Sequence, residues 1–157
     1  MKKTAIFWIL TAFLLAALSG CGQKAAETPQ LEEGSYLEIP STELNEKIQV
    51  YTVHVDGLTM EVLAVKDADG TIRTAFNTCQ VCNGSRKAYF EVNGDQVVCQ
   101  NCGNRFGRKD VGVLSGGCNP YPIFVEDRQD EGDTVRLSYK FLSGSASLFT
   151  RWKENNQ

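Results

Sequence analysis

The feature that most constrains this chain is a doubled C-x-x-C motif in the stretch "NTCQVCNGSRKAYFEVNGDQVVCQNCGNRFG" at residues 77–107. Its spacing is C-x2-C-x16-C-x2-C, formed by Cys79, Cys82, Cys99 and Cys102. Two residues between paired cysteines allow one tight turn to present both sulfur atoms to one ion, and this spacing is typical of metal sites. The motif therefore predicts that the four cysteines bind one metal or iron–sulfur centre.

The residues around each pair favour the same interpretation. Gly103 follows Cys102, and Asn83-Gly84 follow Cys82, so both turns have residues that tolerate a positive φ. Between the pairs, Asn93-Gly94-Asp95 predicts a hairpin turn. A hairpin would bring the two cysteine turns to the same end of its strands.

Three other interpretations of these cysteines remain open. Each C-x-x-C could close as a disulfide in an exported protein. One pair could be a thioredoxin-type redox site, although such a site lies at the start of a helix and no helical pattern follows either pair. The site could also hold a purely structural zinc ion, because tetrahedral sulfur ligation suits both zinc and iron.

The N-terminus predicts export. Lys2 and Lys3 precede an apolar run that is too short to span a membrane and fits an export signal. The run ends in Leu18-Ser19-Gly20-Cys21, which resembles the lipobox of bacterial lipoproteins. The resemblance implies cleavage before Cys21 and lipidation of that residue. The anchor would hold the protein on the outer face of the cell membrane, or on the periplasmic side of an envelope membrane. There is no twin arginine, so we expect export in the unfolded state and a centre acquired afterwards.

The chain is expected to contain one folded domain. We assign residues 1–20 to the signal peptide, 21–34 to a flexible tether, 35–151 to the cysteine-rich domain and 152–157 to a C-terminal tail. The formal net charge is −3, and it becomes more negative when the two N-terminal lysines are removed. No basic tract suggests binding to nucleic acid.

Short, alternating segments predict a mostly β fold. Their spacing and the turn residues between them indicate a small antiparallel sandwich or barrel with the two cysteine turns at one end. The predicted strands are 35–39, 47–55, 59–66, 71–77, 88–92, 96–99 and 134–142.

The second half of the cysteine region resembles Rieske-type domains. Cys99, Cys102 and the following Gly103 and Phe106 correspond to the second cluster-binding loop, and "GGCNPYP" at 116–122 corresponds to the proline loop. Rieske sites use two histidines, whereas this chain has one, His54, far upstream. The resemblance therefore implies a Rieske-like fold with cysteine ligands only.

A closer resemblance is to a bacterial family described as membrane iron–sulfur-containing and linked to iron-transport systems. The stretch from "FNTCQVC" to "GGCNPYPI" is similar to its signature, and the similarity extends over about Tyr36 to Phe149. It implies a cysteine-ligated metal or iron–sulfur centre at a membrane surface. It also implies iron-transport or redox membrane proteins as partners.

The remaining residues refine this prediction. Cys118 is the odd thiol, and three roles remain open for it: a small buried residue, a group that contacts the ligands or replaces one of them, or a redox-active thiol beside the centre. His54 is interpreted as an exposed strand residue and Trp152 as a surface aromatic. Basic residues near the motif are expected to balance the thiolates or steer an anionic partner; they are Arg86, Lys87, Arg105, Arg108 and Lys109.

Two classes of function follow. One is an electron-transfer or iron-handling protein with a redox-active iron centre, which we favour. The other is an accessory lipoprotein with structural zinc. No nucleophile–base arrangement or carboxylate pair indicates hydrolysis, so we expect a protein that is not an enzyme.

Overall fold

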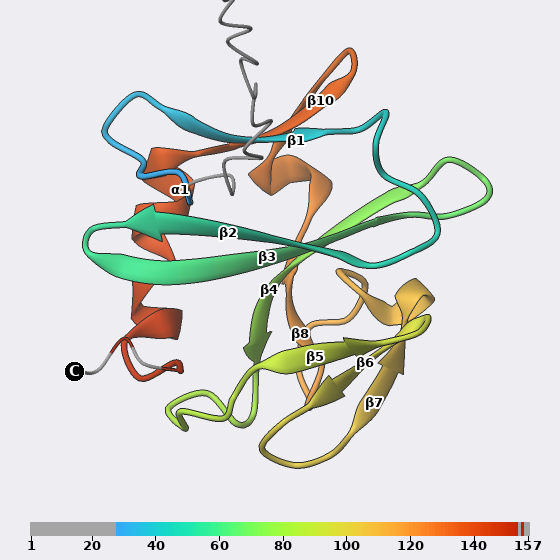
Figure 1. The fold of residues 1–157 in the computed structure, drawn as a ribbon, viewed down its shortest axis with the longest axis vertical. Coiled ribbons are helices and arrows are strands. Elements are labelled where there is room, and N and C mark those ends of the chain that lie inside the picture. The colour runs from blue at the N-terminus through green and yellow to red at the C-terminus, as the bar shows by residue number, and fades with distance from the viewer. Residues whose placement is uncertain (1–27, 154, 156–157) are drawn as a thin grey trace, which may run out of the picture.

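The computed structural model describes residues 28–153 and 155, and this part of the chain is mostly β (Figure 1). Its strands form three antiparallel sheets, with orders β1-β10-β9, β2-β3-β4-β8 and β5-β6-β7. The strands are β1 (Tyr36–Pro40), β2 (Gln49–Val55), β3 (Leu58–Lys66), β4 (Ile72–Cys79), β5 (Phe90–Asn93), β6 (Gln96–Cys99), β7 (Arg105–Gly107), β8 (Pro120–Ile123), β9 (Gln129–Glu131) and β10 (Thr134–Ser138). The predicted mostly β, antiparallel class is confirmed.

The central sheet is built on the long hairpin β2–β3. Asp56 and Gly57 form its turn with φ values of 52° and 77°, which match the Asp-Gly signal in the sequence. Strand β3 is buried on both faces: Met60 and Val62 join one hydrophobic cluster, whereas Leu63 and Val65 join another. Its continuous apolar run follows from this double burial, because successive side chains point to opposite faces.

Strand β4 uses the same alternation to position the cysteine site. Phe76 joins the first cluster, whereas Ala75 and Cys79 join the second, which also contains Phe90 of β5 and Val97 of β6. The face of β4 that carries residues 75, 77 and 79 therefore lies toward the small β5-β6-β7 sheet. That sheet begins with the predicted hairpin, in which Asn93 pairs with Gln96.

The late strand is shorter than predicted. Strand β10 ends at Ser138, and Tyr139–Gly144 form helix α1. The Ser138 hydroxyl accepts a hydrogen bond from the Phe141 N–H (3.2 Å) and caps the helix. The prediction of a strand over 134–142 was wrong for its second half because this cap favours a helical turn. Three short 3-10 helices complete the described structure; they are η1 (Arg108–Asp110), η2 (Val125–Asp127) and η3 (Ala146–Phe149).

The core extends beyond the limits predicted for the domain. Leu31, within the predicted tether, is buried, and a backbone bridge joins Gln30 to His54. Trp152 is only 1% exposed, so its interpretation as a surface aromatic was wrong. Its ring packs edge-on against Phe149, and its indole N–H donates to the Asn77 carbonyl (2.7 Å), which satisfies its polar atom.

Candidate metal centre

The first cysteine turn begins where β4 ends. Cys79 is the last residue of the strand and is fully buried, and its N–H donates to the Ala88 carbonyl (2.9 Å). The turn after Cys82 is closed by a hydrogen bond from the Ser85 N–H to the Cys82 carbonyl (3.0 Å). Gly84 has a φ of 95°, as the Asn-Gly signal predicted.

The second cysteine turn has the same plan. Cys99 ends β6, and the Gly103 N–H returns to the Cys99 carbonyl (2.8 Å) with Gly103 at a φ of 75°. Residues 80–84 and 100–102 are turns, so neither pair lies at the start of a helix. This geometry differs from that of a thioredoxin-type site.

A third segment, which carries Cys118, lies beside the two cysteine turns. The Sγ atoms of Cys79, Cys82, Cys102 and Cys118 all lie within 4.8 Å of one another. Cys118 comes from the loop between η1 and β8. Cys99 is not in this group of four, although its Sγ lies 4.0 Å from that of Cys82. The structure therefore brings all five described cysteines together and places the Cys118 sulfur within the group of four, as expected if Cys118 replaces one of the predicted ligands.

Burial and backbone N–H groups act in opposite directions on the thiols. Burial raises the pKa of the Cys79 thiol above its usual range, while hydrogen bonds from the Cys82 and Val81 N–H groups partly offset this effect. Burial also raises the pKa of Cys99, opposed by the N–H groups of Cys102 and Asn101. Each turn therefore directs its amides at the sulfur of its own first cysteine.

The pKa values of the two outer thiols, Cys102 and Cys118, are shifted in opposite directions. Cys102 is exposed, and a hydrogen bond from the Asn104 N–H lowers its pKa. Cys118 is half-buried, and loss of solvent raises its pKa. The centre would therefore have a buried side at Cys79 and a solvent-facing side at Cys102.

Arg108, one of the predicted basic residues, forms ion pairs with carboxylates. The Arg108 guanidinium pairs with Glu46 (3.0 Å) and Asp67 (3.3 Å), so its charge is already balanced by carboxylates. Lys87, Arg105 and Lys109 are exposed. The expectation that these residues balance the thiolates or steer a partner stays a prediction.

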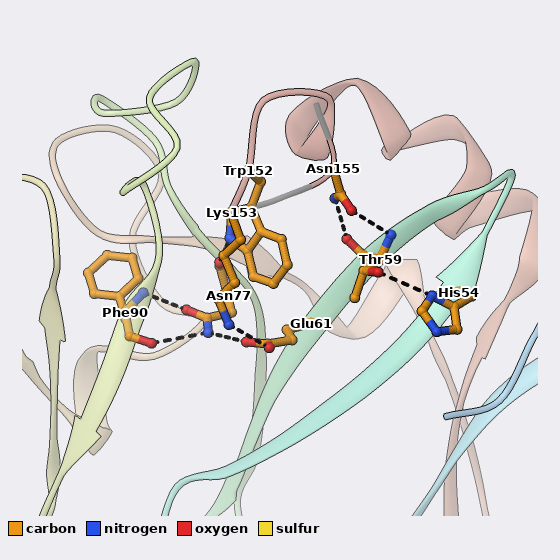
Figure 2. A network of polar contacts seen from close by, with 8 residues as sticks. All are labelled: His54, Thr59, Glu61, Asn77, Phe90, Trp152, Lys153 and Asn155. Atoms are coloured by element: carbon orange, nitrogen blue, oxygen red, sulfur yellow. Dashed lines mark hydrogen bonds and ion pairs between the residues drawn. The ribbon is translucent and has the colours of Figure 1, made fainter. Parts of the chain in front are cut away.

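Asn77, which no sequence motif indicated, connects the small β5-β6-β7 sheet, hereafter the cysteine sheet, to the central sheet (Figure 2). Its amide accepts from the Phe90 N–H (2.8 Å) and donates to the Phe90 carbonyl (3.1 Å) and to Glu61 (2.7 Å). Glu61 also binds Lys153 (2.6 Å). Its position two residues before Cys79, on the same strand face, was the only signal available for it.

His54 lies apart from this group of cysteines. It is half-buried in β2, and its Nδ1 lies 3.2 Å from the Thr59 hydroxyl, as Figure 2 shows. The interpretation of His54 as a strand residue is confirmed, but its side chain is half-buried and not fully exposed as expected.

The cysteine group fits a thiolate-ligated metal. Four ligands at about 2.3 Å from one tetrahedral ion are separated by about 3.8 Å. The four sulfur atoms lie within 4.8 Å of one another, so one ion could be bound by all of them after small shifts of the side chains. Sulfur-only donors in a tetrahedral arrangement suit zinc, iron or an iron–sulfur group. Cys79 belongs to the second hydrophobic cluster, and Cys82 and Cys118 pack against that cluster, so the group is built into the core.

The fold and site define a small antiparallel β domain with a cysteine cluster able to bind a metal. The chain belongs to the family described as membrane iron-sulfur containing protein FtrD-like, whose model matches residues 44–149. A comparison with curated proteins found no match.

The match includes all five clustered cysteines and ends within η3. Within residues 28–153 and 155, the structure has no helix long and apolar enough to cross a membrane. Cys21 and the predicted signal lie outside the described residues.

Proposed function

We propose that this protein is an exported lipoprotein that carries a cysteine-ligated iron or iron–sulfur centre and transfers electrons, or handles iron, beside an iron-transport system. The observation that carries the proposal is the convergence of Cys79, Cys82, Cys102 and Cys118 within 4.8 Å in a chain of an iron–sulfur family. A thiolate-bound iron centre can accept and release one electron, which zinc cannot do.

The protein's own residues would protect one side of such a centre and leave the other open. Cys79 is excluded from solvent, whereas Cys102 is exposed and Val81, in the first turn, is 64% exposed. An exposed edge would allow a partner to approach closely. The buried side would keep water from the remaining thiolates.

Structural zinc is a second candidate with its own support. The four sulfur atoms are close enough for one ion, and their turns join β4, β6 and the Cys118 loop. A single ion in that position would stabilise the domain without any redox chemistry.

Metal analysis and electrochemistry test the proposal directly. The full chain should be purified anaerobically from membranes and analysed for iron, acid-labile sulfide and zinc, with a visible spectrum and a potential titration. We expect bound iron, thiolate-to-iron absorption and a reversible one-electron response. A colourless preparation with one zinc per chain and no such response would instead support structural zinc.

Membrane attachment has a separate test. Replacing the predicted lipidation site, Cys21→Ala, should leave the protein unlipidated and release it from membranes or stall its processing, because the anchor would be lost. Fractionation and intact mass measure this outcome. Cys118→Ala is a control that should keep the lipid. Unchanged mass and membrane retention of the Cys21 variant would contradict lipid anchoring.

A further inference from the structure

We propose that Cys118, in place of Cys99, is the fourth thiolate ligand of the centre, and that Gln80 is a positioning residue that holds the Cys118 loop against the first cysteine turn. This inference rests on the proposed function, because it concerns the same centre. It differs from the ligand set predicted by the doubled C-x-x-C motif.

The distances between sulfur atoms carry the assignment of Cys118. Its Sγ belongs to the group in which every sulfur lies within 4.8 Å of every other, together with Cys79, Cys82 and Cys102. Cys99 contacts the Cys82 sulfur (4.0 Å) and interacts with the thiols of Cys79 and Cys102, but it is outside that group of four. Local turn geometry does not separate Cys79 from Cys99, since each ends a strand and accepts N–H groups from its own turn. The position of the Cys118 loop separates them, because the Cys118 sulfur forms a group with Cys79 and not with Cys99.

Gln80 joins the first cysteine turn to the backbone on both sides of Cys118. Its side-chain oxygen accepts from the Gly116 N–H (2.6 Å). Its side-chain nitrogen donates to the carbonyl oxygens of Leu114 (3.2 Å) and Pro120 (3.4 Å). Its own N–H donates to the Asn119 carbonyl (3.2 Å). One glutamine therefore binds the backbone on both sides of Cys118.

The loop is shaped to present its cysteine. Gly116 and Gly117 have φ values of 91° and 72°, a conformation that other residues rarely adopt. The Asn119 side chain closes the turn by donating to the Gly116 carbonyl (2.7 Å). The Cys79 sulfur lies 3.3 Å from the Cys118 carbonyl oxygen, so the loop lies directly beside the first turn.

Cobalt(II) binding tests the ligand. The full chain, purified from membranes and stripped of metal, is titrated anaerobically with Co(II) alone, and in a second arm with iron(II) and sulfide. Because tetrahedral thiolate sites bind Co(II) with intense absorption, Cys118→Ala should lose about one quarter of the thiolate-to-cobalt intensity and bind at least ~10-fold more weakly. The matched variant Cys99→Ala should keep the wild-type spectrum, since a small apolar side chain can replace a buried thiol.

A Cys118→Ser variant, with circular dichroism to check its fold, distinguishes the loss of a ligand from misfolding. Serine keeps the size of the side chain, so a folded variant with a shifted charge-transfer band supports direct ligation. An unchanged spectrum in Cys118→Ser, or equal losses in Cys99→Ala and Cys118→Ala, would overturn the assignment while leaving the proposed function intact. Failure of the wild-type protein to bind Co(II) or iron would overturn both.

Gln100, in the second cysteine turn, provides a matched control for a substitution of Gln80. Gln100 occupies the same place in its own C-x-x-C, but its amide donates to the Val98 carbonyl (3.1 Å) within the hairpin. Gln80→Ala should lower Co(II) affinity by about 10-fold, as loss of outer-shell partners does, without changing the shape of the spectrum. Gln100→Ala should have little effect. Equal affinities for the two variants would refute a positioning role for Gln80.

Discussion

At the level of single residues, Asn77 is the polar side chain on which the junction of two sheets depends. It is 1% exposed and satisfies both the N–H and the carbonyl of Phe90. Asn77→Ala would leave buried polar groups without partners, so we expect a loss of about 3 kcal/mol in the free energy of unfolding. Urea denaturation measures this loss. The exposed amide of Asn45 provides a control, and equal losses for Asn45→Ala and Asn77→Ala would contradict the role assigned to Asn77.

A second residue, Asp56, predicts a pH dependence. Hydrogen bonds from Ser143 (2.6 Å) and Tyr139 (2.7 Å) hold the pKa of its carboxyl below the usual range. A lowered folded-state pKa adds stability that is present above the unfolded pKa of about 3.9 and is lost as the pH falls through the folded value. The stability difference between the wild type and Asp56→Asn should therefore shrink below about pH 4. Urea melts from pH 3 to 7 test it, and a constant difference would argue against it.

At the level of elements, the loop that carries Cys118 is attached to β4 by close backbone packing. Gly112 has a φ of 68°, and a Cβ there would lie 2.3 Å from the Thr74 carbonyl oxygen. Gly112→Ala should cost about 3 kcal/mol, from the clash and the left-handed backbone together, and should weaken metal binding. Gly116→Ala is a control with a positive φ but open space, so it should cost about 1 kcal/mol. Thermal and urea unfolding compare them, and equal effects would contradict the packing argument.

At the level of the whole molecule, the centre would join the central sheet, the cysteine sheet and the Cys118 loop. Because metal binding to a structured site adds directly to folding free energy, by about 10 kcal/mol for structural zinc, removing the metal should lower the melting temperature sharply. A chelator titration followed by calorimetry measures this effect. Cys79→Ser should show low metal content and little further response to chelator. If reductant lowers the melting temperature while chelator has no effect, disulfides explain the stability better.

Local features were predictable from the sequence because short-range chemistry determines them. The tight cysteine turns follow from the C-x-x-C spacing and the glycines after it, and the hairpin follows from Asn93-Gly94. The β class follows from alternating apolar residues. The late strand was overpredicted because a capping hydrogen bond from Phe141 to Ser138 outweighs β propensity over 139–142.

Only the tertiary structure decided which cysteines meet. Cys118 lies far along the chain from the first turn. Its position depends on hydrogen bonds between Gln80 and the Cys118 loop and on the close approach of Gly112 to Thr74. Trp152 is buried because its indole N–H donates to the Asn77 carbonyl and its ring packs against Phe149. Such contacts leave no periodic trace in the sequence. The C-x-x-C pairs therefore determined that two turns would each present a pair of sulfur atoms. The packing of a distant loop decided which further thiol joins them. The sequence alone could not show this, because the closure of a long loop depends on the partners that the folded chain provides.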